Sequence, residues 1–140
     1  MKNGVRKNNF AFKIPLILLF ISSTSIACTF HWHHYGDKEI FRRISNEIGG
    51  HINHEWCKNY NDKYEIFIIT ESFNNSKGWL GVGSVGIRRQ GSDSTPSSRQ
   101  SAYRYEDGNY VIGESYNLTV QAAMDAVDDL MSTLPAHIPR

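Results

Sequence analysis

Histidines are concentrated in one short part of the chain. Five of the six lie between residues 31 and 54, and His51, His54 and Cys57 follow the spacing H-x-x-H-x-x-C. Imidazole nitrogens bind zinc, copper and nickel, and residues three apart on a helix share a face. One interpretation is therefore a metal-binding protein that takes zinc or copper. Its ligands would be His31, His33, His34, His51 and His54.

A second interpretation assigns these histidines no ligand. Structural zinc sites use tighter pairs that contain cysteine, and a polar arm can carry histidines that only face water or make pH-sensitive contacts. Patterns that would indicate nucleophilic catalysis are also weak. Cys57 with His54, or Ser84 with any histidine, lacks a recognisable third orienting residue. We therefore expect a protein that is not an enzyme and that needs no cofactor, unless the metal interpretation holds.

Gly81, Gly83 and Gly86 follow the spacing G-x-G-x-x-G. A phosphate-binding loop of this pattern lies between a strand and a helix. Here Gly86 is followed by Ile87-Arg88-Arg89 and a polar loop rich in serine, which cannot begin a helix. The pattern instead indicates a central strand whose glycines let a helix or an aromatic ring approach the backbone closely.

The first 27 residues have the features of an export signal. They combine a basic leader, the apolar stretch 14–21 (IPLILLFI) and small residues at positions 25 and 27. A spanning helix needs about 20 apolar residues, so we expect cleavage; the alternative is a short anchor that is never removed. Residues 28–140 would then form one domain, exported to the periplasm or associated with the outer membrane of a bacterium.

Cleavage changes the charge balance. Four of the fifteen basic side chains lie in the leader, which leaves eleven against fourteen acidic ones. A nucleic-acid-binding domain would need a clear basic excess, so we expect no nucleic-acid partner.

Two cysteines remain, and they allow two outcomes. In an oxidising compartment Cys28 and Cys57 would form a disulfide worth about 3 kcal/mol. Alternatively, the sequence Ser25-Ile26-Ala27-Cys28 resembles the lipobox of bacterial lipoproteins, although that pattern prefers leucine where Ser25 stands. That resemblance implies a lipidated Cys28 and a membrane anchor.

Hydrophobic periodicity predicts an α+β domain of order α-β-β-β-β-α, with an antiparallel four-stranded sheet. Asp37 would cap a first helix that stops or kinks at the Gly49-Gly50 pair. The predicted strands are 64–73, 79–89, 102–105 and 110–112, and residues 28–36 form a histidine-rich arm. The last helix would bury one apolar face up to Leu134, with Asp125, Asp128 and Asp129 in water.

Basic and tyrosine residues alternate near the predicted strand 102–105. Because alternate strand residues face opposite ways, Tyr103 and Tyr105 share one face and Arg104 takes the other. An unpaired arginine in the core is costly, so we expect the tyrosines to be buried and the arginine to face water. The predicted binding patch, suited to an acidic folded protein, comprises Arg88, Arg89, Arg99 and Arg104.

Two functional hypotheses follow. The first is an exported, non-catalytic protein-binding module of the bacterial envelope, either of the inhibitor or immunity type or an envelope assembly factor. The alternative is an exported metal-binding protein that uses the histidine cluster.

Overall fold

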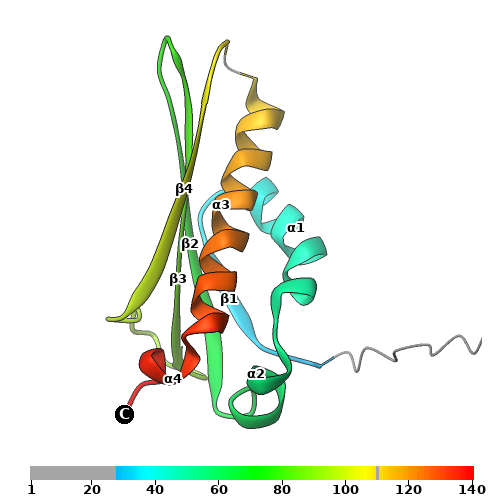
Figure 1. The fold of residues 1–140 in the computed structure, drawn as a ribbon, viewed down its shortest axis with the longest axis vertical. Helices are drawn as coiled ribbons and strands as arrows, with labels where there is room; N and C mark the ends of the chain where they lie inside the picture. The colour runs from blue at the N-terminus through cyan, green and yellow to red at the C-terminus, as the bar shows by residue number, and fades with distance from the viewer. Residues whose placement is uncertain (1–27, 110) are drawn as a thin grey trace, which may run out of the picture.

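The computed structural model describes residues 28–109 and 111–140, so the predicted signal peptide, residues 1–27, lies outside the described part. The described residues form a sheet of order β1-β2-β3-β4, with α1 and α3 on one side of it (Figure 1). The predicted α+β class is confirmed. The strands are β1 (Trp32–Tyr35), β2 (Tyr64–Asn74), β3 (Gly78–Arg89) and β4 (Arg99–Asp107). The helices are α1 (Lys38–Glu47), the 3-10 turn η1 (Ile48–His51), α2 (His54–Asn59), α3 (Ile112–Ser132) and α4 (Leu134–His137).

The short strand β1 arises from the histidine-rich arm and runs parallel to β2. The sheet is therefore mixed, and the prediction of a wholly antiparallel sheet is wrong for this strand. Parallel neighbours need a crossover connection, usually a helix, and α1 lies between β1 and β2 in the chain. The predicted order thus lacked a strand before the first helix.

Long antiparallel pairing joins β2, β3 and β4. The predicted hairpin of β2 and β3 is confirmed, with its turn closed by the Asn75 side chain. This side chain accepts hydrogen bonds from the backbone N–H groups of Lys77 and Gly78, at 2.8 and 3.0 Å. The β3–β4 register continues without an inserted residue along the whole of β4.

The end of β4 differs from the prediction. Residues 99–107 form one long strand instead of the first of two short ones. Of the strand predicted at 110–112, residue 110 lies outside the described part and Ile112 begins α3. Gly108, with a φ of 137°, turns the chain from strand to helix. The Asp-Gly signal was therefore correct for a turn but not for a hairpin.

The first helix begins where the local sequence indicates, whereas α3 begins earlier than its apolar pattern predicts, at Ile112 and without a side-chain cap. The Asp37 carboxylate accepts a hydrogen bond from the Glu39 backbone N–H at 2.7 Å, which caps α1. α1 ends at Glu47, just before the glycine pair. In α3, Val127 and Leu130 are fully buried on the predicted apolar face. No helix of the described residues is long and apolar enough to cross a bilayer.

Two glycines of β3, Gly81 and Gly83, face α3. A Cβ added at Gly81 would lie 2.6 Å from the Cα of Thr119, and one added at Gly83 would come still closer to Ala123. Such distances mean that the helix backbone rests directly on the strand. After Gly86 the chain continues in β3 and then enters a loop that leads to β4. The steric interpretation of the glycine pattern is therefore confirmed for Gly81 and Gly83, whereas a Cβ at Gly86 would meet Pro96 and Ser98 of the β3–β4 loop.

Candidate docking surface

Successive residues of β4 point to opposite faces of the sheet. Arg104 points toward α3, where its guanidinium donates two hydrogen bonds to the Asp125 carboxylate, at 2.6 and 2.9 Å. Tyr103 and Tyr105 point away from the helices and are 74% and 50% exposed. The prediction that the tyrosines are buried is wrong. Asp125 neutralises the arginine on the helix side, so Arg104 is never left without a partner there.

We call the sheet face that points away from α1 and α3 the open face. Alternate strand residues share a face, so the register gives its members. Tyr105 and Phe73 both lie opposite Leu80, and Tyr103 lies opposite Val82. These five neighbouring side chains form what we call the aromatic patch: Phe73, Leu80, Val82, Tyr103 and Tyr105.

The aromatic patch is apolar at its centre and polar at its margin. Phe73 is 52% exposed, and Leu80 and Val82 are only partly buried. The Tyr105 hydroxyl donates to the Asp107 carboxylate at 2.8 Å. This hydrogen bond, together with desolvation, raises the pKa of Tyr105, so the hydroxyl stays protonated.

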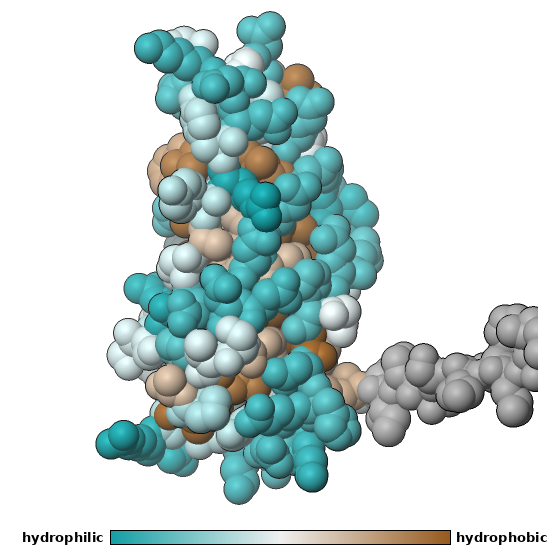
Figure 2. Space-filling view, viewed as in Figure 1, coloured by the Kyte–Doolittle hydropathy of each residue, from teal (hydrophilic) through white to brown (hydrophobic). Residues whose placement is uncertain are grey.

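Figure 2 views the molecule edge on to the sheet. Most of this surface is hydrophilic, and some hydrophobic residues reach its left margin, where the open face is seen in profile. Contiguous exposed apolar groups with a polar rim are typical of interaction sites.

An ion pair occupies the other end of the open face. Arg88 Nε donates to Glu65 Oε1 at 2.5 Å, and both side chains are only 11% exposed. The same guanidinium lies 4.4 Å from the centre of the Phe67 ring, on which His33 stacks at 6.4 Å. Arg88 is thus held by internal contacts and is not a free charge for a partner.

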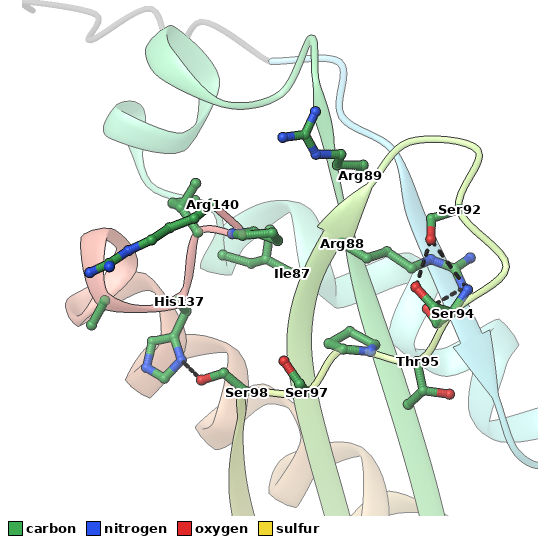
Figure 3. A pocket seen from close by; sticks show the side chains of 14 residues that line it. Ile87, Arg88, Arg89, Ser92, Ser94, Thr95, Ser97, Ser98, His137 and Arg140 are labelled. Carbon is green, nitrogen blue, oxygen red and sulfur yellow. Dashed lines mark hydrogen bonds between the residues drawn. The ribbon is translucent and has the colours of Figure 1, made fainter.

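A hollow of about 550 Å³ lies between the β3–β4 loop and the C-terminal segment (Figure 3). Arg88 and Arg89 contribute to its lining, together with His137 and Arg140. His137 Nδ1 lies 2.7 Å from the Ser98 hydroxyl, which connects the loop to α4. In Figure 3, Arg88 extends under the loop and Arg89 points away from it.

The four predicted binding arginines do not form one patch. Arg88 and Arg99 belong to the open face, whereas Arg104 lies on the helix side. Arg89 is exposed at the end of β3. A role for these residues in binding remains a prediction.

The predicted histidine cluster is divided among different surroundings. His34 Nε2 lies 2.7 Å from Thr70 Oγ1 on the helix side, and burial lowers the pKa of His34 against an opposing effect of Asp37. His51 Nδ1 lies 2.8 Å from an Asp128 carboxylate oxygen. Within residues 28–109 and 111–140, no three His, Cys, Asp or Glu side chains are placed to hold a metal ion together.

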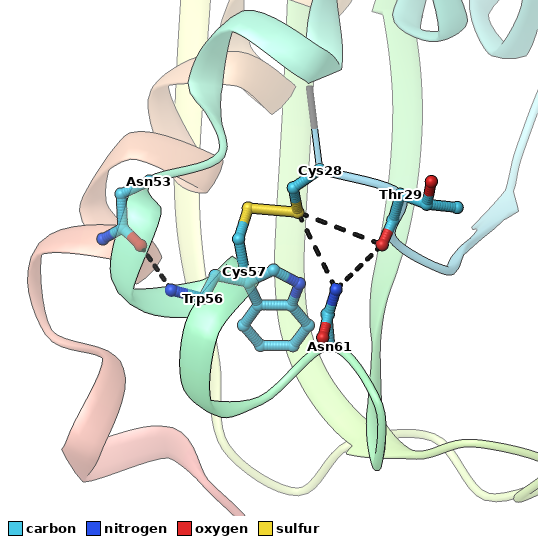
Figure 4. The surroundings of a disulfide bond; sticks show 6 residues. All are labelled: Cys28, Thr29, Asn53, Trp56, Cys57 and Asn61. Atoms are coloured by element: carbon cyan, nitrogen blue, oxygen red, sulfur yellow. Dashed lines mark hydrogen bonds between the residues drawn. A yellow bond between two sulfur atoms is a disulfide. The ribbon is translucent and has the colours of Figure 1, made fainter. Parts of the chain in front are cut away.

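The Cys28–Cys57 disulfide is confirmed, with the two Cα atoms 5.7 Å apart (Figure 4). It joins the segment before β1 to α2. The Asn61 side chain supports the same segment by donating to the Thr29 carbonyl at 2.9 Å. A bonded Cys57 cannot serve as a nucleophile, and the sulfur of Cys28 is not available to a lipid in this form.

Comparison with known proteins gives little. No family model matches the chain, and no curated protein matches it. Among solved structures, a putative lipoprotein from Caulobacter crescentus CB15 is similar at 12% identity and a TM-score of 0.44, over 79% of this chain and 93% of that one. Similarity at this level does not establish a shared function.

Sequence reasoning noted the two tyrosines but expected them to be buried, and it missed the rest of the aromatic patch. Phe73, Leu80 and Val82 belong to strands that carry apolar residues on both faces. A strand that faces water on one side normally alternates apolar and polar residues. The alternation missing from β2 and β3 was therefore the signal that a second apolar surface exists.

Proposed function

We propose that this protein is an exported, non-catalytic protein-binding module of the bacterial envelope, and that it docks a folded partner on the open face. The observation that carries the proposal is the aromatic patch, which lies on the side of the sheet opposite α1 and α3. Tyrosine and other aromatic side chains frequently supply most of the binding energy in protein interfaces.

Export is supported by two independent features. The leader pattern of residues 1–27 is one. The other is the Cys28–Cys57 disulfide, since disulfides persist in oxidising compartments such as the periplasm. Within the envelope, an inhibitor or immunity-type protein and an assembly factor both need a docking surface of this kind.

The absence of catalysis is supported by the contacts of the candidate groups. Cys57 is in the disulfide, and the Ser84 hydroxyl lies 2.8 Å from the Ser101 hydroxyl instead of a base. Arg89 and Arg99 are exposed near the ends of β3 and β4, which favours a partner with acidic groups at the margin of its interface.

Site-specific photo-crosslinking in intact envelopes tests the proposal. A photoreactive residue at Phe73 should join the protein to one discrete partner, which is then identified and purified. The same group at Gln121, which is exposed on α3, is the matched control and should give no such product. Equal products from both positions, or none from Phe73, would contradict docking on the open face.

With the purified partner, the contribution of the patch can be measured. Phe73→Ala should weaken binding by about tenfold or more, as expected when a buried interface aromatic is truncated. The melting temperature should stay close to that of the wild type, because Phe73 is half exposed in the free protein.

A further inference from the structure

Strand β4 is an exposed edge of the sheet. It ends the strand order and has nine residues. Natural edge strands avoid pairing with other chains by being short, by bulges, by proline, or by charged side chains, of which lysine is the most common. β4 contains neither lysine nor proline, and its register against β3 has no bulge. It does carry four charged side chains, but they are two of each sign, and one of the arginines, Arg104, is turned back to Asp125.

Backbone hydrogen bonding shows which residues of β4 face outward. The Gly108 N–H donates to the Lys77 carbonyl at 2.8 Å, and on the other side of β3 the Asn75 N–H donates to the Gly78 carbonyl at 3.0 Å. In an antiparallel ladder, hydrogen-bonded pairs recur at every second residue. Both bonds indicate the same alternation along β4. Its even-numbered residues bond to β3, and its odd-numbered residues, from Arg99 to Asp107, direct their N–H and C=O groups away from the sheet.

We propose that β4 pairs antiparallel with β4 of a second copy of this chain, about a two-fold axis at Tyr103. This register places outward-facing residues opposite each other, as a hydrogen-bonded ladder requires. It also sets Arg99 of each copy opposite Asp107 of the other, on the open face. In the described part of the chain neither Arg99 nor Asp107 has an ion-pair partner.

The cross-strand pairs on the helix side agree with this register. Gln100 meets Glu106, an amide with a carboxylate, and Arg104 meets the small side chain of Ala102. No like charges face each other. A two-fold axis one residue further along would set Arg104 opposite its own copy, and directly opposed like charges are destabilising. The axis at Tyr103 is the one that pairs all nine residues of β4 with one another.

Pairing of this kind would double the sheet and bring two aromatic patches together. Tyr103 and Tyr105 of each copy lie on the same face as the Arg99–Asp107 pairs, so the two open faces would become one continuous surface. The inference does not rest on the proposed function, because it follows from the edge of the sheet and not from its face.

Sedimentation equilibrium of the exported protein, with and without charge variants, tests the pairing. The wild type should be a dimer. Arg99→Glu alone, or Asp107→Arg alone, sets like charges opposite each other at both ends and should raise the dissociation constant about tenfold. An equimolar mixture of the two variants restores opposite charges at both ends and should associate as tightly as the wild type. A mixture that associates no better than either variant alone would overturn the register.

A proline variant provides the control for folding. Tyr103→Pro removes an N–H group that points outward, so it should abolish the dimer while nearly preserving the melting temperature, as proline is tolerated where a strand N–H faces solvent. A wild type that remains a monomer at about 100 μM, or a Tyr103→Pro protein that still dimerises, would overturn the proposal. Crosslinking from Phe73 to another protein is unaffected by either result, so this inference and the proposed function can fail separately.

Discussion

Replacement of Gly83 by alanine tests the close contact of α3 with β3. The new Cβ would lie under 3.0 Å from the backbone of Ala123, and a helix backbone cannot turn aside as a flexible side chain can. α3 would have to move away from the sheet on which it buries Val127 and Leu130. Overpacking a core typically costs about 1–3 kcal/mol. Because a whole helix must shift, we expect the free energy of unfolding to fall by about 3 kcal/mol. In a domain of this size, that loss lowers the melting temperature by about 12 °C.

Urea unfolding followed by circular dichroism measures this loss. Gly49→Ala is the control, since nothing lies within 4 Å of a Cβ added there. Where it causes no strain, a change from glycine to alanine stabilises a protein by about 0.4–1 kcal/mol, because it reduces the conformational entropy of the unfolded chain. The two variants should therefore change stability in opposite directions. A Gly83→Ala protein as stable as the wild type would refute the account of how α3 packs on β3.

Three further predictions concern stability. Cys57→Ser should lower the free energy of unfolding by about 3–4 kcal/mol, because the disulfide closes a loop of 29 residues; urea melts of reduced and oxidised wild type should differ by the same amount. Leu130→Ala should cost about 2–5 kcal/mol, whereas Asp129→Ala on the exposed side of α3 should cost under about 0.5 kcal/mol in the same melts. Burial lowers the pKa of His34, so the unfolded chain, with a histidine pKa of about 6.5, binds this proton more readily than the folded protein. Stability should therefore fall as the pH drops below about 6.5, and it should fall less steeply in His34→Gln. Identical pH profiles of melting temperature for the wild type and this variant would contradict the prediction.

The parts of the fold that the sequence predicts are those with local signals. The period of apolar residues was sufficient for the buried face of α3 but not for its start at Ile112, and the turn residues between β2 and β3 located their hairpin. β1 was missed because its four residues are too few to show a pattern and because its parallel partner is distant in the chain. The extent of β4 depended in the same way on its pairing with β3.

The candidate site was only partly predictable for a similar reason. Which face Tyr103 takes depends on Arg104, and Arg104 faces the helix because Asp125, 21 residues away, receives it there. Nothing in the local sequence of β4 contains that information. Likewise, Phe73 and Tyr105 become neighbours only through the register of two strands with Leu80 between them.

The central claim is that a partner docks on the open face. Tyr103 and Arg104 allow the most direct test of this claim, because they are adjacent in β4 but point to opposite faces. Once crosslinking has identified the partner, its affinity should be measured by calorimetry for Phe73→Ala with Tyr103→Ala, and separately for Arg104→Ala. The account predicts that the first pair of substitutions weakens binding by at least about a hundredfold, while Arg104→Ala changes it by less than about threefold. Loss of affinity in Arg104→Ala with unchanged binding in the double variant would contradict the claim.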